Sequence, residues 1–392
     1  MHGHSGKIVM SSLPLPSPEA QTHSDQLCKL IRHDIALQGG WIPFSRFMEL
    51  ALYAPGLGYY SAGARKLGSA GDFVTAPEIS ALFGRALARQ IIEIFAQSSP
   101  HILELGAGSG KLAVDILSEL HRQNRLPERY DILEVSADLR ARQKTLLEER
   151  LPHLVNRVHW LNTPPDNISG VVIANEVLDA LPVHLVRWTD TRIMERGVTH
   201  SGSAFEWQER LPQIPALHQL AQHINVPDDT LSEISLAARG LVKTLSSRLH
   251  QGVLLFIDYG FGAREYYHPQ RSCGTLMCHY RHHAHDDPFF LPGLQDITSH
   301  VDFTAVAEAA IDAELHLYGY TTQAHFLVNC GITDLLAETD PKNALDYLPL
   351  SAQLQKLTSP AEMGDLFKVI ALGKDMATPL CGFMSGDKSR LL

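Results

Sequence analysis

A glycine turn between a short apolar run and an amphipathic helix constrains this chain more than any other feature. The apolar run is Ile102–Leu105, the turn lies within Glu104–Gly110 (ELGAGSG), and a helical stripe of apolar residues extends from Leu112 to Leu120. Glycine allows a tight backbone turn and lets a ligand approach the main chain. A strand, a turn and a helix in this order form the repeating unit of parallel α/β sheets.

Further apolar runs of strand length alternate with helical patterns along the chain. These runs are Ile132–Val135, Val158–Trp160, Val171–Ala174, Val253–Ile257 and Phe367–Leu372. Their alternation with helices predicts an α/β fold with a doubly wound, parallel sheet. With 392 residues, the chain is long enough for two domains or for one large decorated domain.

The N-terminal part of the chain does not follow this rhythm. A helix is expected from Ser24, and a later helix that runs to about Phe95 is expected to open with a capping box at Thr75–Glu78. The Gly- and Tyr-rich stretch Tyr53–Gly71 lies between them. This composition predicts an exposed loop.

A second interruption, Pro182–Gly252, is too long for a loop between a strand and a helix. It begins with strand-like stretches, and a helix is expected over Leu231–Leu249. We expect this insertion to form a lobe over the carboxyl edge of the sheet, where ligands of open α/β folds bind. The predicted organisation is a flexible segment (1–23), a helical and loop segment (24–98), the sheet domain (99–181 and 253–374), the inserted substrate-facing lobe (182–252) and a C-terminal tail (375–392).

Composition narrows the classes of function. The formal net charge of −10 argues against a general binder of nucleic acid or membrane surfaces. No apolar run reaches the roughly 18 residues of a membrane span. The five cysteines are scattered and form no CxxC pair, which favours a reducing compartment.

The spacing of the glycines indicates which cofactor the turn would bind. Lys111 follows Gly110, so the pattern is G-x-G-x-G, whereas the dinucleotide fingerprint is G-x-G-x-x-G. Glu104, two places before Gly106, would repel a pyrophosphate and suits the ammonium group of S-adenosylmethionine (SAM). SAM is therefore favoured, with a dinucleotide or a turn without any ligand as alternatives. Glu134, at the end of the next strand, would accept hydrogen bonds from the ribose hydroxyls.

Polar residues also follow two later strands. Asn175 and Glu176 begin the stretch Asn175–Pro182 (NEVLDALP), which also contains Asp179. These groups either face the crevice above the sheet or cap the helix that follows. In the crevice, a carboxylate could orient a nitrogen nucleophile or take up its proton. Asp258 ends the fifth run and either faces the same crevice or forms a strand-end turn.

Histidines and aspartates cluster near residue 283. The cluster comprises His279, His282, His283, His285, Asp286 and Asp287. Their spacing matches no structural zinc site and no cysteine pair accompanies them, so we expect a polar loop and no metal. Recognition of the substrate by a histidine or an aspartate is the alternative.

In this order, the segments resemble the MidA-type SAM-dependent methyltransferases, from about Leu27 to Gly373. The likeness is carried by Gly71–Ser80 (GDFVTAPEIS), Glu104–Gly110, Asn175–Pro182, Ile257–Gly260 (IDYG) and Gln295–Thr298 (QDIT). The family includes a mitochondrial assembly factor that methylates an arginine on a subunit of respiratory complex I. The resemblance implies a class I SAM-methyltransferase fold: a Rossmann-like, doubly wound sheet of seven strands with an N-terminal helical segment and an inserted lobe.

The resemblance also implies roles for individual residues. For the cofactor, these are Thr75, Glu78, Glu104, Gly106, Gly108, Gly110, Glu134 and Asn175. For catalysis, they are Glu176 and Asn175 beside the transferable methyl, with Asp179 and Asp258 assisting. For substrate binding, they are Asp72, His282, His285 and Asp296.

The implied activity is SAM-dependent methylation of an arginine on a partner protein, with a respiratory-complex subunit as one candidate. Two alternatives stay open: a SAM-binding assembly factor or scaffold with little turnover, and a small-molecule methyltransferase. The first residues (MHGHSGKIVM) show neither a signal peptide nor a mitochondrial presequence. We therefore expect a bacterial, cytoplasmic member of the family, which leaves the complex I substrate open.

Overall fold

The computed structural model describes residues 13–62, 75–377 and 379–392. Its largest element is a central sheet of eight strands in the order β15-β16-β10-β5-β2-β3-β4, with β14 paired to β10 off this path. The strands are β2 (His101–Leu105), β3 (Arg129–Leu133), β4 (Val158–Leu161), β5 (Ile168–Asn175), β10 (Leu249–Phe261), β14 (Val301–Asp302), β15 (His316–Thr322) and β16 (Phe367–Lys374). Neighbouring strands are parallel except for β16, which runs antiparallel to both β10 and β15.

The predicted α/β class with a mostly parallel sheet is confirmed. The strand number differs from the expected seven because the two-residue strand β14 adds a short pairing beside the end of β10.

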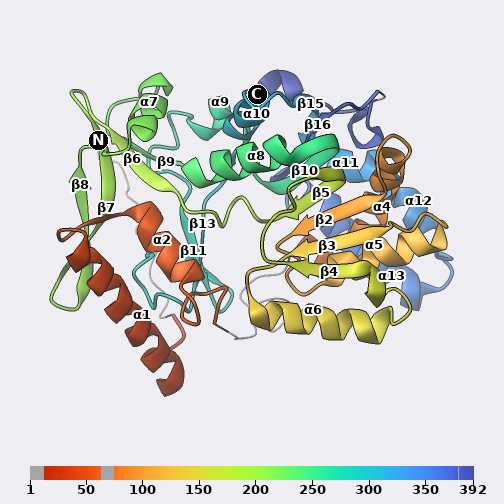
Figure 1. Ribbon diagram of the computed structural model, residues 1–392, viewed down its shortest axis with the longest axis horizontal. Coiled ribbons are helices and arrows are strands. Elements are labelled where there is room, and N and C mark those ends of the chain that lie inside the picture. The colour runs from red at the N-terminus through yellow and green to blue at the C-terminus, as the bar shows by residue number, and fades with distance from the viewer. Residues whose placement is uncertain (1–12, 63–74, 378) are drawn as a thin grey trace.

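Helices cover both faces of this sheet (Figure 1). Adjacent strand residues point to opposite faces, and Ile102 and Leu103 accordingly belong to different apolar clusters. One cluster includes side chains of α4 (Ala81–Phe95), α5 (Lys111–Arg122), α6 (Ala137–Arg150), α11 (Gln323–Asn329) and α12 (Ile332–Ala337). The other includes side chains of α8 (Leu236–Arg248) and α10 (Phe303–Ile311).

A second lobe lies beside the sheet domain (Figure 1). It combines α1 (Pro18–Leu37), β1 (Ile42–Pro43) and α2 (Phe44–Tyr53) with β6 (His184–Trp188), β7 (Ile193–Ser201), β8 (Ala204–Arg210) and β9 (Thr230–Ile234). A small sheet of β11 (Met277–Tyr280), β12 (His283–His285) and β13 (Asp296–Thr298) packs into it.

One apolar core joins these separate segments of the second lobe. Leu27 and Phe47 from the N-terminal segment share a cluster with Val198 of the insertion and with Cys278 and Ile297 of the small sheet. β1 also pairs antiparallel with β7. The insertion therefore does not fold by itself against the sheet, because its core is completed by the N-terminal helices.

Several local predictions are wrong. The helix expected from Ser24 begins at Pro18, within the segment 1–23 that was predicted to be flexible. The helix expected from Thr75 to Phe95 is interrupted, because Ser80 is extended (φ −155°) and separates α3 (Ala76–Ile79) from α4. Ser80 accepts a hydrogen bond from the Leu82 N–H at 3.3 Å, whereas Thr75 makes no side-chain cap. The supposed capping box is therefore replaced by a serine cap one turn later.

The helix expected over Leu231–Leu249 is also shorter. Leu231 and Ile234 lie on β9, which pairs with β6, and α8 begins only at Leu236. α8 then packs against the central sheet. A leucine and an isoleucine three residues apart fit the helical period and not the strand period of two, so the pairing of β9 with β6 overrides the local pattern.

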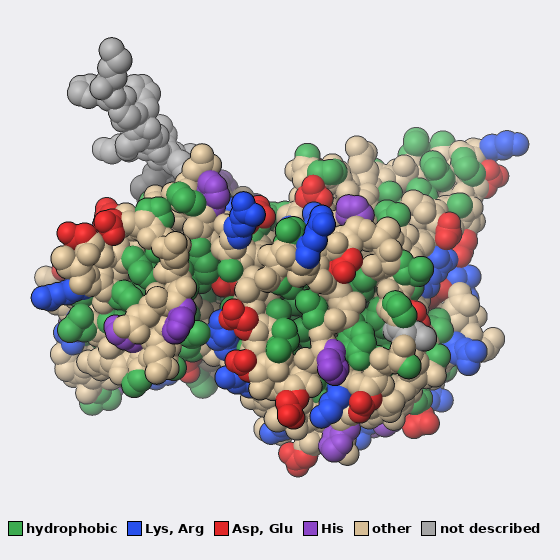
Figure 2. All heavy atoms as spheres, turned by 90° about the horizontal axis from the view of Figure 1, so that it is seen from above, with side chains coloured by type: hydrophobic (Ala, Val, Ile, Leu, Met, Phe, Trp, Pro, Cys, Tyr) green, Lys and Arg blue, Asp and Glu red, His purple; other side chains and the backbone are tan. Residues whose placement is uncertain are grey.

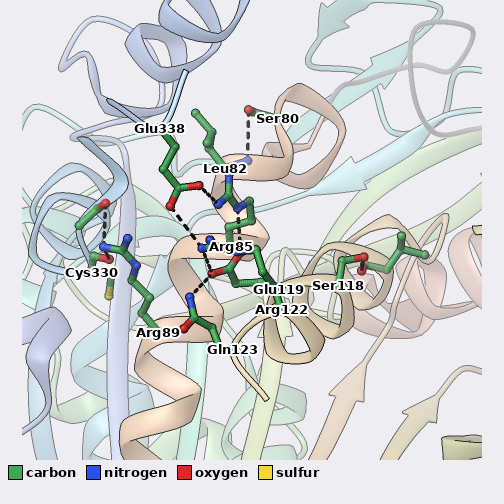
Figure 3. A network of polar contacts seen from close by, with 12 residues as sticks. Ser80, Leu82, Arg85, Arg89, Ser118, Glu119, Arg122, Gln123, Cys330 and Glu338 are labelled. Atoms are coloured by element: carbon green, nitrogen blue, oxygen red, sulfur yellow. Dashed lines mark hydrogen bonds and ion pairs between the residues drawn. The ribbon is translucent and has the colours of Figure 1, made fainter. Parts of the chain in front are cut away.

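A network of ion pairs around the buried Glu119 joins helices α4, α5 and α12 (Figure 3). Glu119 on α5 accepts hydrogen bonds from Arg85 Nε of α4 at 2.9 Å and from Arg122 Nη2 at 2.6 Å. Glu338, at the end of α12, bonds both arginines. Hydrogen bonds to the two arginines and Gln123 outweigh the effect of burial and lower the pKa of Glu119 to about 2. The network ties three helices of one face together.

The outer surface is of mixed charge. On the face shown in Figure 2, Lys and Arg side chains are interspersed with Asp and Glu, in keeping with the formal charge of −10. Within the described ranges, no helix combines the length and the apolar character needed to cross a bilayer.

Candidate functional site

The glycine turn after β2 has a backbone that suits only glycine. Gly106, Gly108 and Gly110 have φ angles of 61°, 55° and 87°, a region that side chains disfavour. A Cβ on Gly106 would lie 3.2 Å from Val177 Cγ2, and one on Gly110 would lie 3.2 Å from Gln143. Without Cβ atoms, the turn packs closely against Val177 and Gln143 at the carboxyl edge of the sheet, and we call it the glycine cradle.

The second wall of this cradle follows β3. Glu134 is buried one residue beyond the strand and accepts hydrogen bonds from Ser136 N at 2.9 Å and from Gln143 Nε2 at 3.1 Å. Gln143 also donates to Gly108 O at 2.9 Å, and Trp160 Nε1 donates to Gln143 Oε1 at 2.9 Å. Gln143 therefore locks the turn to the carboxylate. No sequence pattern marks Gln143 as a site residue beyond its place on a helix after Glu134.

Glu104 lies beneath the turn, on β2. Its carboxyl group is buried and accepts a hydrogen bond from Tyr130 Oη at 2.8 Å. Burial is the main cause that raises the pKa of Glu104 to about 7. A cation bound at the edge of the sheet would favour the ionised form.

The short helix α3 contacts the turn from the N-terminal side. Ser109 Oγ donates to Glu78 Oε1, and Lys111 Nζ donates to Glu78 O at 3.2 Å. Thr75 immediately precedes α3, at its N-cap position. Asp72, which the sequence placed in the substrate site, lies outside the described residues.

Strand β5 ends at Asn175, and Glu176 is the next residue. Glu176 has a left-handed backbone (φ 52°), and its N–H donates to Ile257 O at 2.9 Å. Asn175 Nδ2 donates to Glu176 Oε1 at 3.0 Å. Burial, followed by the charge of Asp179, raises the pKa of Glu176 to about 8. The carboxyl group is thus predominantly protonated at neutral pH when no cation is bound.

Asp258, on β10, clamps the backbone of the same loop. Its side chain is 1% exposed, and Oδ2 accepts the N–H groups of Leu178 at 2.9 Å and Asp179 at 3.2 Å. Oδ1 accepts the N–H of Tyr259 at 2.9 Å. Burial and the charges of Asp179 and Glu176 raise its pKa. Its observed contacts are those of a group that fixes the loop.

Asp179 carries an unsatisfied oxygen. The side chain is 5% exposed, and Oδ1 has no hydrogen-bond partner among the described residues. Burial raises the pKa of this carboxyl group, and its interaction with the Tyr259 hydroxyl opposes that rise. Buried carboxylate oxygens are rarely left without a donor, so this atom indicates a place for a ligand that donates hydrogen bonds.

The second lobe contributes a further carboxylate. Asp296 on β13 is 2% exposed, and Tyr60 Oη donates to its two oxygens at 3.0 and 3.1 Å. Tyr53 stacks on Tyr60 with ring centroids 5.6 Å apart and donates to Ala180 O at 2.9 Å. The charge of Asp296 raises the pKa of Glu176, so the two carboxyl groups belong to one electrostatic site.

Both tyrosines were missed as site residues, although the Gly- and Tyr-rich composition of the loop was visible. The described part of that loop is not an exposed segment as predicted, since the neighbouring Tyr59 is only 1% exposed. Its rings pack against one another and into the core of the second lobe.

The two histidines lie on a hairpin of the small sheet. His282 is exposed at the turn between β11 and β12, with φ 64°. His285 Nδ1 accepts from Asp287 N at 3.3 Å, and burial lowers the pKa of its imidazole. Over the ranges that the structure describes, no group of three or more His, Cys, Asp or Glu side chains could hold a metal ion.

The fold is α/β. The carboxyl edge of its sheet carries the glycine cradle and the buried acidic side chains described above. Residues 86–321 match the model of a family described as S-adenosyl-L-methionine-dependent methyltransferases. A protein from Burkholderia thailandensis, solved with S-adenosyl-homocysteine bound, is 47% identical with a TM-score of 0.94, over 97% of this chain and 100% of that one.

Curated relatives extend over most of the chain. The Drosophila melanogaster "Protein arginine methyltransferase NDUFAF7 homolog, mitochondrial" is 30% identical over 92% of this chain and 87% of its own length. The human protein of this name is 28% identical over 85% and 80%. The chain therefore belongs to the MidA-type family of SAM-dependent methyltransferases, and its cofactor is SAM.

The residues present fit that cofactor. In the glycine cradle, the absence of side chains at Gly106 and Gly110 allows positive φ angles and close packing on Val177 and Gln143. Glu134 is oriented by two donors and can accept ribose hydroxyls. Glu104 places a carboxyl group for an ammonium beneath the turn.

Proposed function

We propose that this methyltransferase modifies a guanidinium nitrogen of an arginine on a partner protein. The observation that carries the proposal is the buried Oδ1 of Asp179, which has no hydrogen-bond partner among the described residues; the charges of Asp179 and Asp296 both act on Glu176. A guanidinium is planar, permanently charged and has five N–H donors, which suits several carboxylates. The curated relatives named protein arginine methyltransferases support the same substrate class.

The chemistry needs a carboxylate because arginine is a poor nucleophile. Its charge is delocalised, and its pKa is above ~12. When SAM is bound, it supplies an electrophilic methyl group on a positively charged sulfur. The remaining work falls to the chain: Glu176 and Asp179 bind the guanidinium, localise its charge and free the lone pair of one nitrogen. Glu176 then takes the proton that this nitrogen releases.

The electrostatics of the unliganded site are consistent with this role. With its pKa raised to about 8, Glu176 is a stronger base than an ordinary carboxylate. An arriving guanidinium favours the ionised form. Asp258 holds the loop through backbone N–H groups, so the geometry of both acidic side chains is set before the substrate binds.

The other predicted residues take supporting roles in this proposal. Thr75, Glu78, Glu104, the three glycines, Glu134 and Asn175 surround the cofactor. Asp296 binds the guanidinium from the second lobe. Asp72, His282 and His285 stay predicted contacts to the protein around the arginine. The complex I subunit and the bacterial cytoplasm likewise stay predictions.

The test is methyl transfer from radiolabelled SAM into the proteins of a cell lysate. We expect wild type to label a small set of proteins and E176Q to lose at least ~100-fold in rate while it binds S-adenosyl-homocysteine normally. E206Q, which changes an exposed glutamate of β8, is the matched control and should behave as wild type. Equal labelling by E176Q and wild type would remove Glu176 from the mechanism. Label found only in small molecules would contradict a protein substrate.

A further inference from the structure

The acidic site is assembled from both lobes. Asp179 comes from the loop after β5 of the sheet domain, and Asp296 comes from β13 of the second lobe. Both charges raise the pKa of Glu176, and both raise the pKa values of Tyr53 and Tyr60. The carboxylates therefore act on the same groups although they lie far apart in the sequence.

Each of these two carboxylates is held by a tyrosine hydroxyl. Tyr60 Oη donates to both oxygens of Asp296, at 3.0 and 3.1 Å, and the N–H of Ile297 adds a third bond at 3.0 Å. The Tyr259 hydroxyl interacts with the Asp179 carboxyl group and opposes the rise in its pKa, while Asp179 Oδ1 has no hydrogen-bond partner among the described residues. A phenol that donates to a carboxylate restricts its rotation and stabilises its charge.

The tyrosine rings are themselves fixed. Tyr259 packs edge-on against His300 at 5.1 Å and Phe367 at 5.5 Å. Tyr60 stacks on Tyr53, which donates to Ala180 O, the residue after Asp179. Across this loop, Ser299 N donates to Asp179 O at 3.0 Å. The second lobe is thus bonded to two successive backbone carbonyls of the acidic loop, those of Asp179 and Ala180.

We propose that Tyr60 and Tyr259 are positioning residues that hold Asp296 and Asp179, one carboxylate from each lobe, as a pair for the substrate guanidinium. This inference rests on the proposed function and adds to it a specificity device. A planar guanidinium can bond two oriented carboxylates in its own plane, whereas a lysine ammonium is a point charge with three donors. Selection of arginine over lysine then depends on the orientation that the tyrosines impose.

The experiment measures binding of Nα-acetyl-L-arginine amide to the full chain saturated with S-adenosyl-homocysteine, so that no methyl transfer occurs. The variants are Y60F and Y259F, which keep the rings and remove only the hydroxyls. Y318F is the matched control. Tyr318 lies on β15, far from the acidic loop in the sequence, and its Oη donates to Met376 O. Nα-acetyl-L-lysine amide is the comparison ligand.

We expect Y60F and Y259F each to weaken arginine amide binding by about ten-fold, because the carboxylate loses a charge-assisted hydrogen bond. Lysine amide binding should change less than two-fold, and the affinity for S-adenosyl-homocysteine should match wild type. In methyl transfer, KM should rise with kcat nearly unchanged. Y318F should behave as wild type throughout.

Three outcomes would overturn the inference. Unchanged arginine binding in both tyrosine variants shows that the hydroxyls position nothing that the substrate needs. A parallel loss of S-adenosyl-homocysteine affinity shows a general structural role. If wild type binds no arginine amide and transfers no methyl to arginine, the proposed function itself fails, and the control arms identify that case.

Discussion

At the scale of single residues, Glu176 combines two unfavourable features. Its backbone has a positive φ of 52°, which costs about 1 kcal/mol or more for a residue with a side chain. Its carboxyl group lies where burial and a neighbouring charge raise the pKa to about 8. Both features reduce stability, and both place a basic carboxylate at the edge of the sheet. Strain retained at such a position is characteristic of a functional residue.

Glu176 should set the acid limb of the pH profile. Protonated Glu176 can neither bind a guanidinium as an anion nor accept a proton. We therefore expect kcat/KM for an arginine substrate to rise with pH, to reach half its maximum near pH 8, the pKa of the group in the free enzyme, and to level off about one unit higher. Initial rates between pH 6 and 9.5 measure this limb. Residual activity of E176Q should lack it, and an identical limb in E176Q would assign it to another group.

The same carboxyl group should make stability depend on pH. Its folded pKa of about 8 lies above the ordinary value of 4.5, so the native state binds more protons than the unfolded state between these values. The free energy of unfolding therefore falls as pH rises through that window. E176Q lacks the group, so its Tm should exceed that of wild type by roughly 2 °C or more at pH 8.5 and by less at pH 5. Calorimetry of both proteins decides; a Tm difference that does not change with pH would contradict this account.

At the scale of secondary-structure elements, the turn between β2 and α5 carries the cofactor site. Its three glycines have positive φ angles, and two of them pack closely against Val177 and Gln143. Because the loop after β5 supplies Val177 and α6 supplies Gln143, the cradle depends on the packing of three elements.

We expect G110A to weaken S-adenosyl-homocysteine binding by at least ~10-fold. Gly110 has φ 87°, and its Cβ would press on Gln143, which holds both the turn and Glu134. G240A is the matched control: Gly240 lies within α8, and nothing stands within 4 Å of the Cβ position. That change should leave binding intact and stabilise the helix by up to ~1 kcal/mol. Titration calorimetry would refute the cradle if G110A bound as tightly as wild type.

The network around Glu119 should matter for stability and not for chemistry (Figure 3). E119Q leaves Arg85 and Arg122 without their buried anion, and we expect a loss of about 2–3 kcal/mol in urea unfolding at pH 7. Because the folded pKa of about 2 lies below the ordinary 4.5, this stabilisation is present above pH 4.5 and is lost as pH falls toward 2. E338Q, which changes the more exposed partner, should cost less. Equal unfolding free energies for E119Q and wild type would show that the network is unimportant.

Sequence patterns located the elements that have strong periodicity. Buried parallel strands such as β2, β5 and β10 are continuous apolar runs and were found to within a few residues. β15 was missed, because its sequence HLYGYTT mixes polar and apolar residues at the edge of the sheet. β9 was taken for part of a helix because apolar spacing alone is ambiguous in short segments.

Some residues of the candidate site could likewise be predicted from the sequence, and others could not. Glu134, Asn175, Glu176 and Asp258 were visible as polar residues at the ends of predicted strands, because the carboxyl ends of parallel strands meet at one edge. Tyr53, Tyr60 and Gln143 were not, since their positions depend on how the second lobe and α6 pack. Contacts between segments so far apart in the chain leave no local pattern.

At the scale of the whole molecule, one lobe faces the edge of the central sheet (Figure 1). It is formed by the N-terminal helices, the strands of the insertion and the small sheet. This lobe is bonded to the loop after β5 through Tyr53, which donates to Ala180 O. Tyr60 of the same lobe donates to the carboxylate of Asp296. With a formal charge of −10, the chain as a whole attracts a basic partner.

Methylation of a basic protein should therefore be sensitive to salt. Raising NaCl from 50 to 500 mM should increase KM for the protein substrate by at least ~3-fold, because long-range attraction is screened. KM for a short peptide whose single arginine is its only charged residue should change much less. Steady-state kinetics at both salt concentrations check this, and equal sensitivity of the two substrates would contradict a role for overall charge.

The most direct test of the central claim locates the transferred group. Purified protein is incubated with lysate and trideuteromethyl-SAM, and tandem mass spectrometry identifies the modified atom. The account predicts the label on a guanidinium nitrogen of arginine in a protein, absent when E176Q replaces wild type. A label on lysine, on a carboxyl group or only on small molecules would contradict it.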